Sequence, residues 1–588
     1  MILVFGGTTE GREAAKVLDE SGATYCYSTR SDTQDIQLVH GVHVTGAMEV
    51  PEMVTFCQKH NIRLIVDAAH PFAVNLHRNV IELAGQIGVP VIRYDRIFPP
   101  HDEDLVWCKD YDDAISQLEA HGVSRLLTLT GVNTIGKMQG YWQEHECWFR
   151  ILNRDESQER AQKAGFPAGH LVYYEKDDTA SLIERLQPQA IITKESGLSG
   201  GFTEKVEAAR QSGIKIFVIE RPEYPYSPDV VIHHVNGPHG LRRKVEKLLP
   251  KFYPLHSGLT TGTCATAAAI AATIRMKTGE MPASVPVILP DGETIDVEVT
   301  YGDGYAAVFK ESGDDPDVTN GIEIRATVEP CDHFEILGGE GVGKFTVPGF
   351  DFPPGEPAIN KAPRQMLRDN IKENVSITIS VPQGAEIARR TFNPRLGIEG
   401  GISIIGVSGI VKPFSEEAFV ASIRKCMQVA KASGSDRVVI NSGGKSERFV
   451  KAQYPDLPQQ AFVEYGNYIG ETLTIANELD IKNVTMGVML GKAVKLAAGN
   501  LDTHSRHTTM DKDFVMGMLH EAGISIDISD LTLARELWDM IPQEKLQDFA
   551  TVVINHCTQY CAPLLPNGNL TILLITDTGT IYNNQSKT

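Results

Sequence analysis

The turn GGTTEGR combines glycines with hydroxyl side chains at the first turn from a predicted strand to a predicted helix, a position that suits a phosphate-bearing cofactor. It follows the apolar run MILVF and precedes a helical pattern, so a pyrophosphate could approach the glycine backbone and meet free N–H groups at a helix N-terminus. A plain tight turn is the alternative, because the spacing is not GxGxxG. The expected cofactor contacts are Gly6, Gly7, Thr8, Thr9, Glu10, Gly11 and Arg12.

The residues at the end of the second predicted strand help to distinguish NAD from NADP as the cofactor. An Asp or Glu there would bind the ribose 2′-hydroxyl of NAD, but the sequence reads Ser28-Thr29-Arg30. Arg30 can bind the additional phosphate of NADP, and the alternative is a solvated surface arginine. We expect NADPH or NADH, with a slight preference for NADPH.

Two further stretches place reactive side chains where predicted strands end. DAAHPFA contains His70, and TKESGLSGGF contains Lys194, Ser196 and Gly197. Doubly wound folds bind ligands outside the carboxyl ends of their strands. We therefore expect His70 and Lys194 to be catalytic, and Ser196 and Gly197 to contact substrate. The alternative is structural, with the histidine satisfying a backbone carbonyl and the glycines capping a turn.

A threonine-rich turn opens an alanine-rich helix midway along the chain, in LHSGLTTGTCATAAAIAA. Threonine caps helices, and a helix N-terminus can bind a carboxylate or phosphate. A capped core helix without ligand is the alternative. The residues expected to contact substrate here are Thr260, Thr261, Gly262, Thr263 and Cys264.

The stretch GKAVKLAAGNLDTHSRH carries basic, hydroxyl and imidazole groups. His504 and Ser505 are too close in sequence to indicate a hydrolase triad, so we expect His504 to be a general base. The expected substrate contacts are Lys492, Lys495, Thr503, Ser505 and Arg506.

Two other motifs are set aside. GGEGVGKF resembles a phosphate-binding loop, but Phe345 replaces the Ser or Thr that binds magnesium, and the following glycines and prolines exclude a helix. A kinase is therefore disfavoured. The acids of ESGDDPDVTNG do not match a calcium-binding loop, and we expect no protein metal site.

The elements that position these groups follow from the alternation of apolar runs and amphipathic stretches. We expect two doubly wound, Rossmann-like α/β subdomains, at about 1–105 and 106–250, then a linker at 251–257. Residues 258–588 are expected to form a separate, mixed α+β unit of non-Rossmann type, whose residues 541–588 have no assigned role. The predicted strands are MILVF, ATYCYST, IRLIVDAA, VPVIRY, RLLTLTG, CWFRIL, AIITKES and IKIFVIE.

Composition narrows the class of protein. A chain of 588 residues with a formal net charge of -20 is too long for one core, and its charge argues against nucleic acid as a partner. The nine scattered cysteines indicate reduced thiols. We expect a soluble, cytoplasmic protein without a membrane partner. A homo-oligomer is one alternative that the sequence leaves open.

The first half resembles the precorrin-6A reductase family in four motifs: MILVFGGTTEGREAA, VDAAHPFAVNLHRNVIELA, VIRYDR and TKESGLSGGFTEKVEAAR. The resemblance implies reduction of cobalt-precorrin-6A to cobalt-precorrin-6B by a nicotinamide bound at Gly6–Gly11. The tetrapyrrole would lie in a cleft between the two subdomains, with His70 and Lys194 pairing with its carboxylates or assisting protonation. Residues 164–178 depart from the family pattern.

The second half resembles the cobalt-precorrin-5B C1-methyltransferase family over residues 257–540. The motifs are GLTTGTCATAAAIAA, GDDPDVTNG, GEGVGKFTVPGF with GEPAINKAPR, GGISIIGVSGIVKPFSEEA and KLAAGNLDTHSRH. The resemblance implies S-adenosylmethionine as methyl donor, for which Gly406–Gly409 and Ser442–Lys445 are candidate turns. Met489 stands where the family pattern has His.

The two resemblances imply one bifunctional enzyme of cobalamin biosynthesis, because the methyltransferase's product is the reductase's substrate. Joining them raises the effective concentration of the intermediate at the second site. The departures at residues 164–178 and at Met489 leave an alternative, a corrinoid- or nucleotide-binding carrier that has lost one or both activities.

Overall fold

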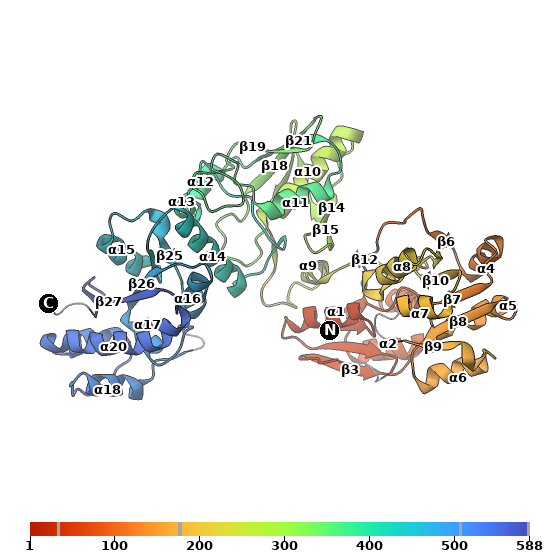
Figure 1. Cartoon of the computed structure of the whole chain (residues 1–588), viewed down its shortest axis with the longest axis horizontal. Coiled ribbons are helices and arrows are strands. Elements are labelled where there is room, and N and C mark those ends of the chain that lie inside the picture. The colour runs from red at the N-terminus through yellow and green to blue at the C-terminus, as the bar shows by residue number, and fades with distance from the viewer. Residues whose placement is uncertain (32–35, 175–178, 505–507, 585–588) are drawn as a thin grey trace. The chain divides into compact units, whose positions relative to one another are not determined.

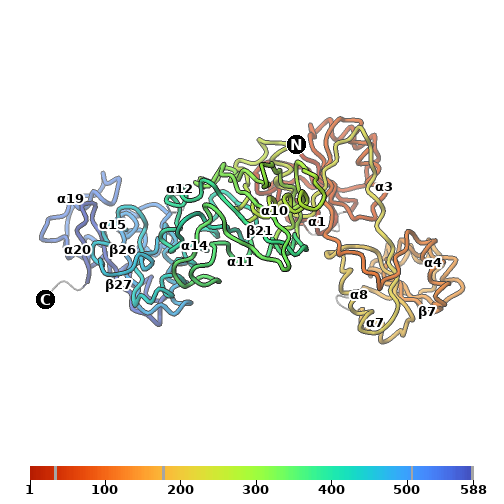
Figure 2. Tube along the Cα trace, turned by 90° about the horizontal axis from the view of Figure 1, so that it is seen from above, coloured from red at the N-terminus to blue at the C-terminus, as the bar shows by residue number. Residues whose placement is uncertain are grey.

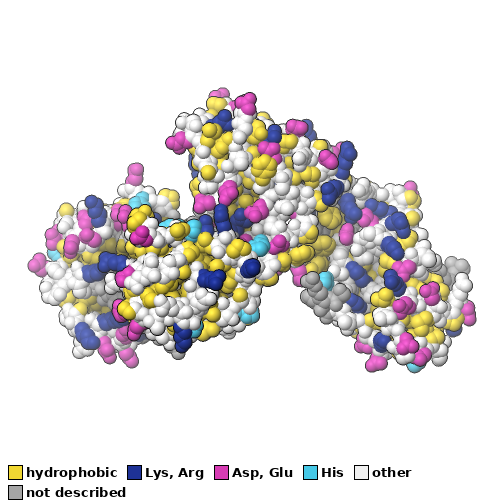
Figure 3. Space-filling view, turned by 180° about the vertical axis from the view of Figure 1, so that it is seen from behind, with side chains coloured by type: hydrophobic (Ala, Val, Ile, Leu, Met, Phe, Trp, Pro, Cys, Tyr) yellow, Lys and Arg dark blue, Asp and Glu magenta, His cyan; other side chains and the backbone are white. Residues whose placement is uncertain are grey.

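A computed structural model of the chain describes residues 1–31, 36–174, 179–504 and 508–584 (Figure 1). The chain forms two compact units. The first comprises Met1–His256 with Pro286–Asp296, and the second comprises Ser257–Val285 with Val297–Thr588. No helix among the described residues is both long and apolar enough to cross a membrane. Figure 3 shows Lys and Arg side chains interspersed with Asp and Glu across one face.

The first sheet of the first unit is parallel throughout, in the order β12-β5-β4-β1-β2-β3. Its central strands are short and apolar and are buried on both faces, as parallel sheets covered by helices require. The strands are β1 (Ile2–Phe5), β2 (Tyr25–Thr29), β3 (Gly41–Thr45), β4 (Leu64–Asp67), β5 (Val91–Tyr94) and β12 (Ile232–Val235). The helices that cover it are α1 (Thr9–Asp19), α2 (Val50–Lys59), α3 (Val74–Ile87) and α9 (Pro238–Leu248).

The second sheet of this unit is also parallel, in the order β6-β11-β10-β7-β8-β9. Figure 2 shows it as a separate lobe from the first sheet. Its strands are β6 (Val106–Cys108), β7 (Arg125–Thr128), β8 (Glu146–Ile151), β9 (Leu171–Tyr173), β10 (Ala190–Lys194) and β11 (Lys215–Ile219). Its helices are α4 (Tyr111–Ala120), α5 (Gln139–Trp142), α6 (Asp155–Lys163), α7 (Thr179–Leu186) and α8 (Phe202–Gln211).

The two parallel sheets and all eight strands predicted for the first half are confirmed. The prediction that residues 106–250 all belong to the second subdomain is wrong, because the chain returns to the first sheet before residue 250. β12 pairs in parallel with β5, and α9 packs against α1. The second sheet is thus an insertion between β5 and β12. β5 and β12 are far apart in sequence, so their pairing depends on packing. The local periodicity of the sequence cannot predict such a pairing.

The second unit begins with a helix on an antiparallel-dominated sheet. α10 (Thr261–Thr278) packs against the sheet β16-β17-β18-β21-β19, and its alanines allow a close approach. The strands are β16 (Thr300–Tyr301), β17 (Ala306–Phe309), β18 (Glu323–Pro330), β19 (Glu335–Gly338) and β21 (Val375–Ser380). Around them lie β13 (Gly258–Leu259), β14 (Ser284–Ile288), β15 (Thr294–Glu298), β20 (Lys344–Phe345), β22 (Ile398–Glu399), β23 (Ile410–Val411), α11 (Lys361–Asn370), α12 (Gly384–Ala388) and α13 (Asn393–Leu396). No helix follows Phe345 before α11, as expected.

The last part of the second unit differs from the expected non-Rossmann arrangement. Its sheet runs β25-β24-β26-β27-β28, and every pair is parallel except β27 with β28. The strands are β24 (Val438–Asn441), β25 (Phe462–Glu464), β26 (Asn483–Met489), β27 (Asn569–Ile575) and β28 (Ile581–Tyr582). The helices are α14 (Glu416–Ala432), α15 (Gly444–Gln453), α16 (Ile469–Glu478), α17 (Leu490–Ala497), α18 (Lys512–Glu521), α19 (Leu537–Met540) and α20 (Leu546–Cys561). Residues 541–588 therefore include a central strand of this sheet.

Candidate functional site

The GGTTEGR turn joins β1 to α1 at the point where the first sheet's strand order reverses. Thr8 caps α1, since its hydroxyl accepts from the Gly11 backbone N–H at 3.0 Å. A Cβ at Gly11 would lie 2.8 Å from the Gly6 Cα, so glycine allows the helix to approach the strand. Gly7 has φ +95° and open space beside it. The turn therefore fits a pyrophosphate at the start of α1.

The other expected cofactor contacts differ in surroundings. The Arg12 guanidinium donates to the Thr9 hydroxyl at 3.1 Å, and both lie toward solvent. Arg30 is exposed just after β2, where it is accessible to a phosphate. Glu10 is buried and turns toward the second sheet. It forms an ion pair with Arg96 at 3.1 Å and accepts a hydrogen bond from the Ser199 hydroxyl.

Contacts bring the carboxyl-end loops of the two sheets together. The Arg96 guanidinium donates to the Ser196 carbonyl at 2.7 Å, and a Cβ at Gly197 would lie 2.8 Å from the Arg96 Cβ. The Lys194 ammonium lies 5.1 Å from the ring centroid of Phe72. Ser196 and Gly197 are both buried. The two stretches in which we predicted reactive groups are thus adjacent through Lys194 and Phe72, and Arg96 joins the second stretch to Glu10 of the cofactor turn.

His70 and Lys194 have strongly altered acidity. Burial, followed by the charges of Arg96 and Lys194, lowers the pKa of His70 to about 3. Its Nδ1 accepts from the Phe72 N–H at 3.2 Å, which leaves Nε2 as the protonated nitrogen of a neutral ring. Burial, followed by the charge of Lys137, lowers the pKa of Lys194 to about 8. Near neutral pH, Lys194 is therefore the better proton donor.

Sequence reasoning missed a buried network behind this edge. Asp67 accepts from His77 at 2.7 Å, from Tyr224 at 2.8 Å and from Arg93 at 3.2 Å. Burial alone would raise the pKa of Asp67, but the hydrogen bond from His77 and the charge of Arg93 hold it below its usual value. The motif VDAAHPFAVNLHRNVIELA contains Asp67 and His77, and VIRYDR contains Arg93, but their contact is visible only in three dimensions.

The threonines at the start of α10 contact the segment around residues 403–409. Thr260 caps the helix by accepting from the Thr263 N–H at 3.2 Å, and Thr263 donates to the Gly409 carbonyl at 2.6 Å. Thr261 accepts from the Ile405 N–H at 2.8 Å. All three are buried, as are Gly262 and Cys264. Protein groups thus engage these hydroxyls, and their contact with substrate stays a prediction.

The lysines of the last predicted cluster surround the loop after β25. Lys492 donates to the Gly466 carbonyl and, at 2.9 Å, to Oδ1 of Asn467. Burial lowers the pKa of Lys492 to about 8. Lys495 lies 3.4 Å from the carbonyl of Thr503, which is buried. The backbone N–H of His504 donates to Asp502 at 2.9 Å. Ser505 and Arg506 lie outside the described residues.

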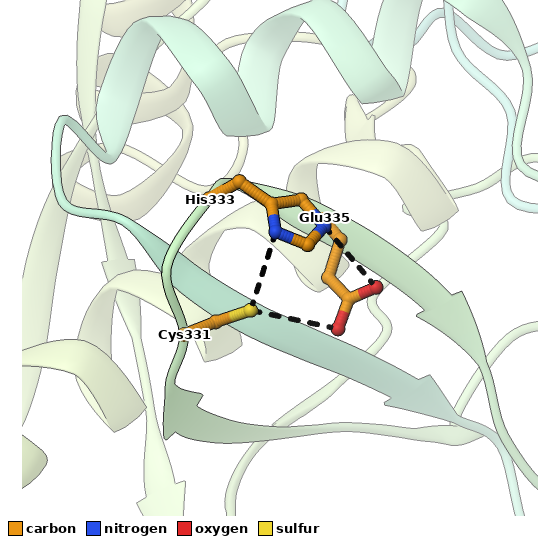
Figure 4. A group of neighbouring side chains, drawn as sticks. All are labelled: Cys331, His333 and Glu335. Atoms are coloured by element: carbon orange, nitrogen blue, oxygen red, sulfur yellow. Dashed lines mark hydrogen bonds and ion pairs between the residues drawn. The ribbon is translucent and has the colours of Figure 1, made fainter.

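Among the described residues, two groups of side chains have the types that bind metals. Figure 4 shows Cys331, His333 and Glu335 turned toward one another, with Sγ 3.7 Å from Nδ1 and 3.9 Å from Oε1. These contacts between β18 and the start of β19 already account for the arrangement, and we assign it no metal. In the second group, His239, Asp291 and Glu293, the Glu293 carboxylate caps α9 by accepting from the His239 and Gly240 N–H groups. Its oxygens are therefore already occupied.

Two family models match the chain. The model described as Precorrin-6x reductase CbiJ/CobK matches residues 1–236, and the CbiD model matches residues 250–413. A Cobalt-precorrin-5B C(1)-methyltransferase from Prosthecochloris aestuarii is 41% identical over 346 residues, covering 55% of this chain and 94% of the relative. One of the same name from Brucella anthropi is 43% identical over 296 residues, covering 47% of this chain and 80% of the relative.

Solved structures resemble each half. The cobalamin biosynthesis protein cbiD from Archaeoglobus fulgidus is 31% identical, with a TM-score of 0.26, and the match covers 43% of this chain and 83% of that one. A structure titled CobK precorrin-6A reductase is 19% identical, with a TM-score of 0.35, and the match covers 42% of this chain and 97% of that one.

Proposed function

We infer the function from membership: the chain belongs to the cobalt-precorrin-5B C(1)-methyltransferase family, and a precorrin-6x reductase domain precedes that family's domain. It is a bifunctional enzyme of cobalamin biosynthesis. We propose that the second unit methylates cobalt-precorrin-5B at C-1 with S-adenosylmethionine, forming cobalt-precorrin-6A. The first unit then reduces this product to cobalt-precorrin-6B with NADPH or NADH.

The observation that carries the reductase proposal is the charge at the meeting edge of the two sheets. Lys194 and Lys205 lie close enough to His70 that their charges lower its pKa, as does the charge of Arg96, which is itself paired with Glu10. The acetate and propionate arms of a precorrin are anionic, so this edge complements them electrostatically. Ser196 and Gly197 shape the same edge and would contact the macrocycle.

In the proposed reduction, the cofactor turn binds the nicotinamide cofactor and the meeting edge of the two sheets binds the tetrapyrrole. Gly6–Gly11 would hold the pyrophosphate, and Arg30 would bind the 2′-phosphate that distinguishes NADPH. When bound, the nicotinamide supplies a hydride to one carbon of the reduced double bond. The Lys194 ammonium gives a proton to the other carbon and becomes a neutral amine, which water reprotonates. His70, neutral at working pH, donates a hydrogen bond through Nε2 to a substrate oxygen.

Methyl transfer needs a different arrangement. The nucleophile is an electron-rich carbon of the macrocycle itself, so the protein has to align donor and acceptor and needs no nucleophilic side chain. We propose that Lys492, Lys495 and Thr503 hold the acidic arms of cobalt-precorrin-5B. The ligand contacts predicted for Thr260, Thr261, Gly262 and Cys264 and the base role predicted for His504 remain part of this proposal. The Thr263 hydroxyl is left out of it, because it is buried and donates to the Gly409 carbonyl.

A single assay tests both reactions. The full chain is incubated with cobalt-precorrin-5B, S-adenosylmethionine and NADPH, and the product's mass is followed over time. Gain of one methyl group and then of two hydrogens is expected. Omitting the nicotinamide should stop the reaction after the methyl gain, and replacing NADPH by NADH compares the two cofactors. A tetrapyrrole that binds but returns unchanged would indicate the carrier.

A further inference from the structure

The last sheet reverses its strand order between β24 and β26. The chain leaves β24 through α15 to reach β25 on one side, and α16 then carries it across to β26 on the other. In open parallel sheets, ligands bind outside the carboxyl ends of the strands at such a reversal. The two strands end at Asn441 and Met489. We therefore expect a ligand at this edge. The family matches assign none to it.

The turn after β24 leaves its backbone accessible. Gly443 and Gly444 have φ of +84° and +54°, and a Cβ at Gly444 would meet nothing within 4 Å. The Ser446 hydroxyl accepts from the Ser442 N–H at 3.1 Å, and Asn441 accepts from the Gly443 N–H at 2.8 Å, which fixes the turn. The first N–H groups of α15 have no partner within the helix. They can receive a carboxylate from a ligand.

An acidic residue lies directly against this turn. Glu464 ends β25, about 20 residues after the glycines, the position at which nucleoside-binding folds place the acid that holds the ribose hydroxyls. A Cβ at Gly443 would come 2.3 Å from Oε1 of Glu464. The carboxylate is partly exposed, and its other oxygen lies 3.3 Å from Arg395. A negative charge here repels a 2′-phosphate and favours a free ribose.

The competing turn, Gly406–Gly409, has no comparable space. A Cβ at Gly406 would lie 2.2 Å from the Thr260 hydroxyl oxygen, and the Gly409 carbonyl accepts from the Thr263 hydroxyl and the Thr260 N–H. The threonines of α10 therefore fill this turn. In the turn after β24, Gly443 likewise faces a side chain, that of Glu464, but Gly444 has nothing within 4 Å of a Cβ.

We propose that S-adenosylmethionine binds at the carboxyl edge of β24 and β25, with Glu464 accepting hydrogen bonds from both ribose hydroxyls and the start of α15 receiving the methionyl carboxylate. This assignment rests on the proposed methyl transfer and places its donor. Lys492, which follows the neighbouring strand β26, lies beside the donor, so the acceptor's acidic arms would meet the methyl group from that side.

Binding of S-adenosylhomocysteine to the full chain, measured by calorimetry, tests the site. Glu464→Gln keeps the shape of the side chain and removes its charge, so the dissociation constant should rise about 10- to 100-fold, because charged hydrogen bonds are lost. 5′-Methylthioadenosine and its 2′-deoxy form supply a second test. The wild type should lose about tenfold in affinity without the 2′-hydroxyl, and Glu464→Gln should lose almost none.

Arg395→Gln is the matched control, because it breaks the same ion pair but leaves the carboxylate. Its affinity for S-adenosylhomocysteine should stay within about threefold of wild type. Equal weakening by the two substitutions would overturn the proposal, since Glu464 would then act through its ion pair. If Glu464→Gln binds as tightly as wild type, the site is wrong while methyl transfer stands. A wild-type chain that neither binds the ligand nor methylates overturns the function as well.

Discussion

Two glycine-rich turns in this chain have the same design and differ in what lies beside them. The turns β1–α1 and β24–α15 each follow a buried strand at a reversal of strand order, and each has an unobstructed glycine, Gly7 and Gly444. The neighbouring strand ends near Arg30 in the first case and in Glu464 in the second. We propose that both backbone turns bind nucleoside ligands, and that the charge on the next strand selects a phosphorylated ribose at the first turn and a free ribose at the second.

The surroundings of the two turns differ as well. Beside the first turn, Glu10 and Arg96 form a buried ion pair. Next to this pair lies the edge of the second sheet that carries Lys194 and Lys205. Beside the second turn, Glu464 and Glu447 share Arg395. The meeting edge of the two sheets therefore gathers lysine charge that suits an anionic substrate, while the edge beside the second turn exposes part of the Glu464 carboxylate. This fits a cationic sulfonium better than a phosphate.

The largest effect is expected from Lys194→Met, which should slow the reaction at the first turn and leave the reaction at the second turn unchanged. It removes the proposed proton donor from the reductase edge, and general acids contribute about 10²- to 10⁴-fold to rate. The reduction of cobalt-precorrin-6A should slow by that factor, as measured by NADPH oxidation in single-turnover experiments. The methyl-transfer rate of the same variant is the internal control and should be unchanged. Retention of the reduction rate would remove Lys194 from the mechanism.

The parts of the chain that sequence predicted share one property, which is that their signals are local. The strand-turn-helix at Gly6–Gly11 and the eight apolar strands could be seen within single windows. β25 could not, because it spans only Phe462–Glu464, and so the acid beside the second turn was missed. The spacing from VVINSGGK to Glu464 was present in the sequence, but a strand that short has no periodicity to recognise.

The next effect in size concerns Arg30→Ala. Losing a charged hydrogen bond to the 2′-phosphate should raise the KM for NADPH about 10- to 100-fold and leave the KM for NADH unchanged, which steady-state kinetics with each cofactor would measure. This result would distinguish the two turns, because the turn beside Glu464 is not expected to prefer a ligand with a 2′-phosphate. Equal values for both cofactors in wild type and variant would make Arg30 an ordinary surface residue.

The pH dependence of reduction should follow Lys194. Burial and the charge of Lys137 lower its pKa to about 8, and the protonated form is the active one. The value of kcat/KM should therefore be level below pH 8 and fall about tenfold per unit above it. Lys137→Met removes the repelling charge, so the descending limb should move to higher pH. A limb that stays in place would assign the titration to another group.

The smallest effect is expected at the third helix start, that of α10, where the threonines form protein contacts. Thr263 is fully buried, and its hydroxyl donates to the Gly409 carbonyl at 2.6 Å. Thr263→Val keeps the volume and removes the donor, which should lower the free energy of unfolding by about 1 kcal/mol. Urea denaturation measures this. The affinity for cobalt-precorrin-5B should not change, because the hydroxyl already has a protein partner. If the affinity for cobalt-precorrin-5B falls while the free energy of unfolding is unchanged, the substrate contact predicted for this helix start is supported. The start of α10 would then bind a ligand, as is proposed for the two glycine turns.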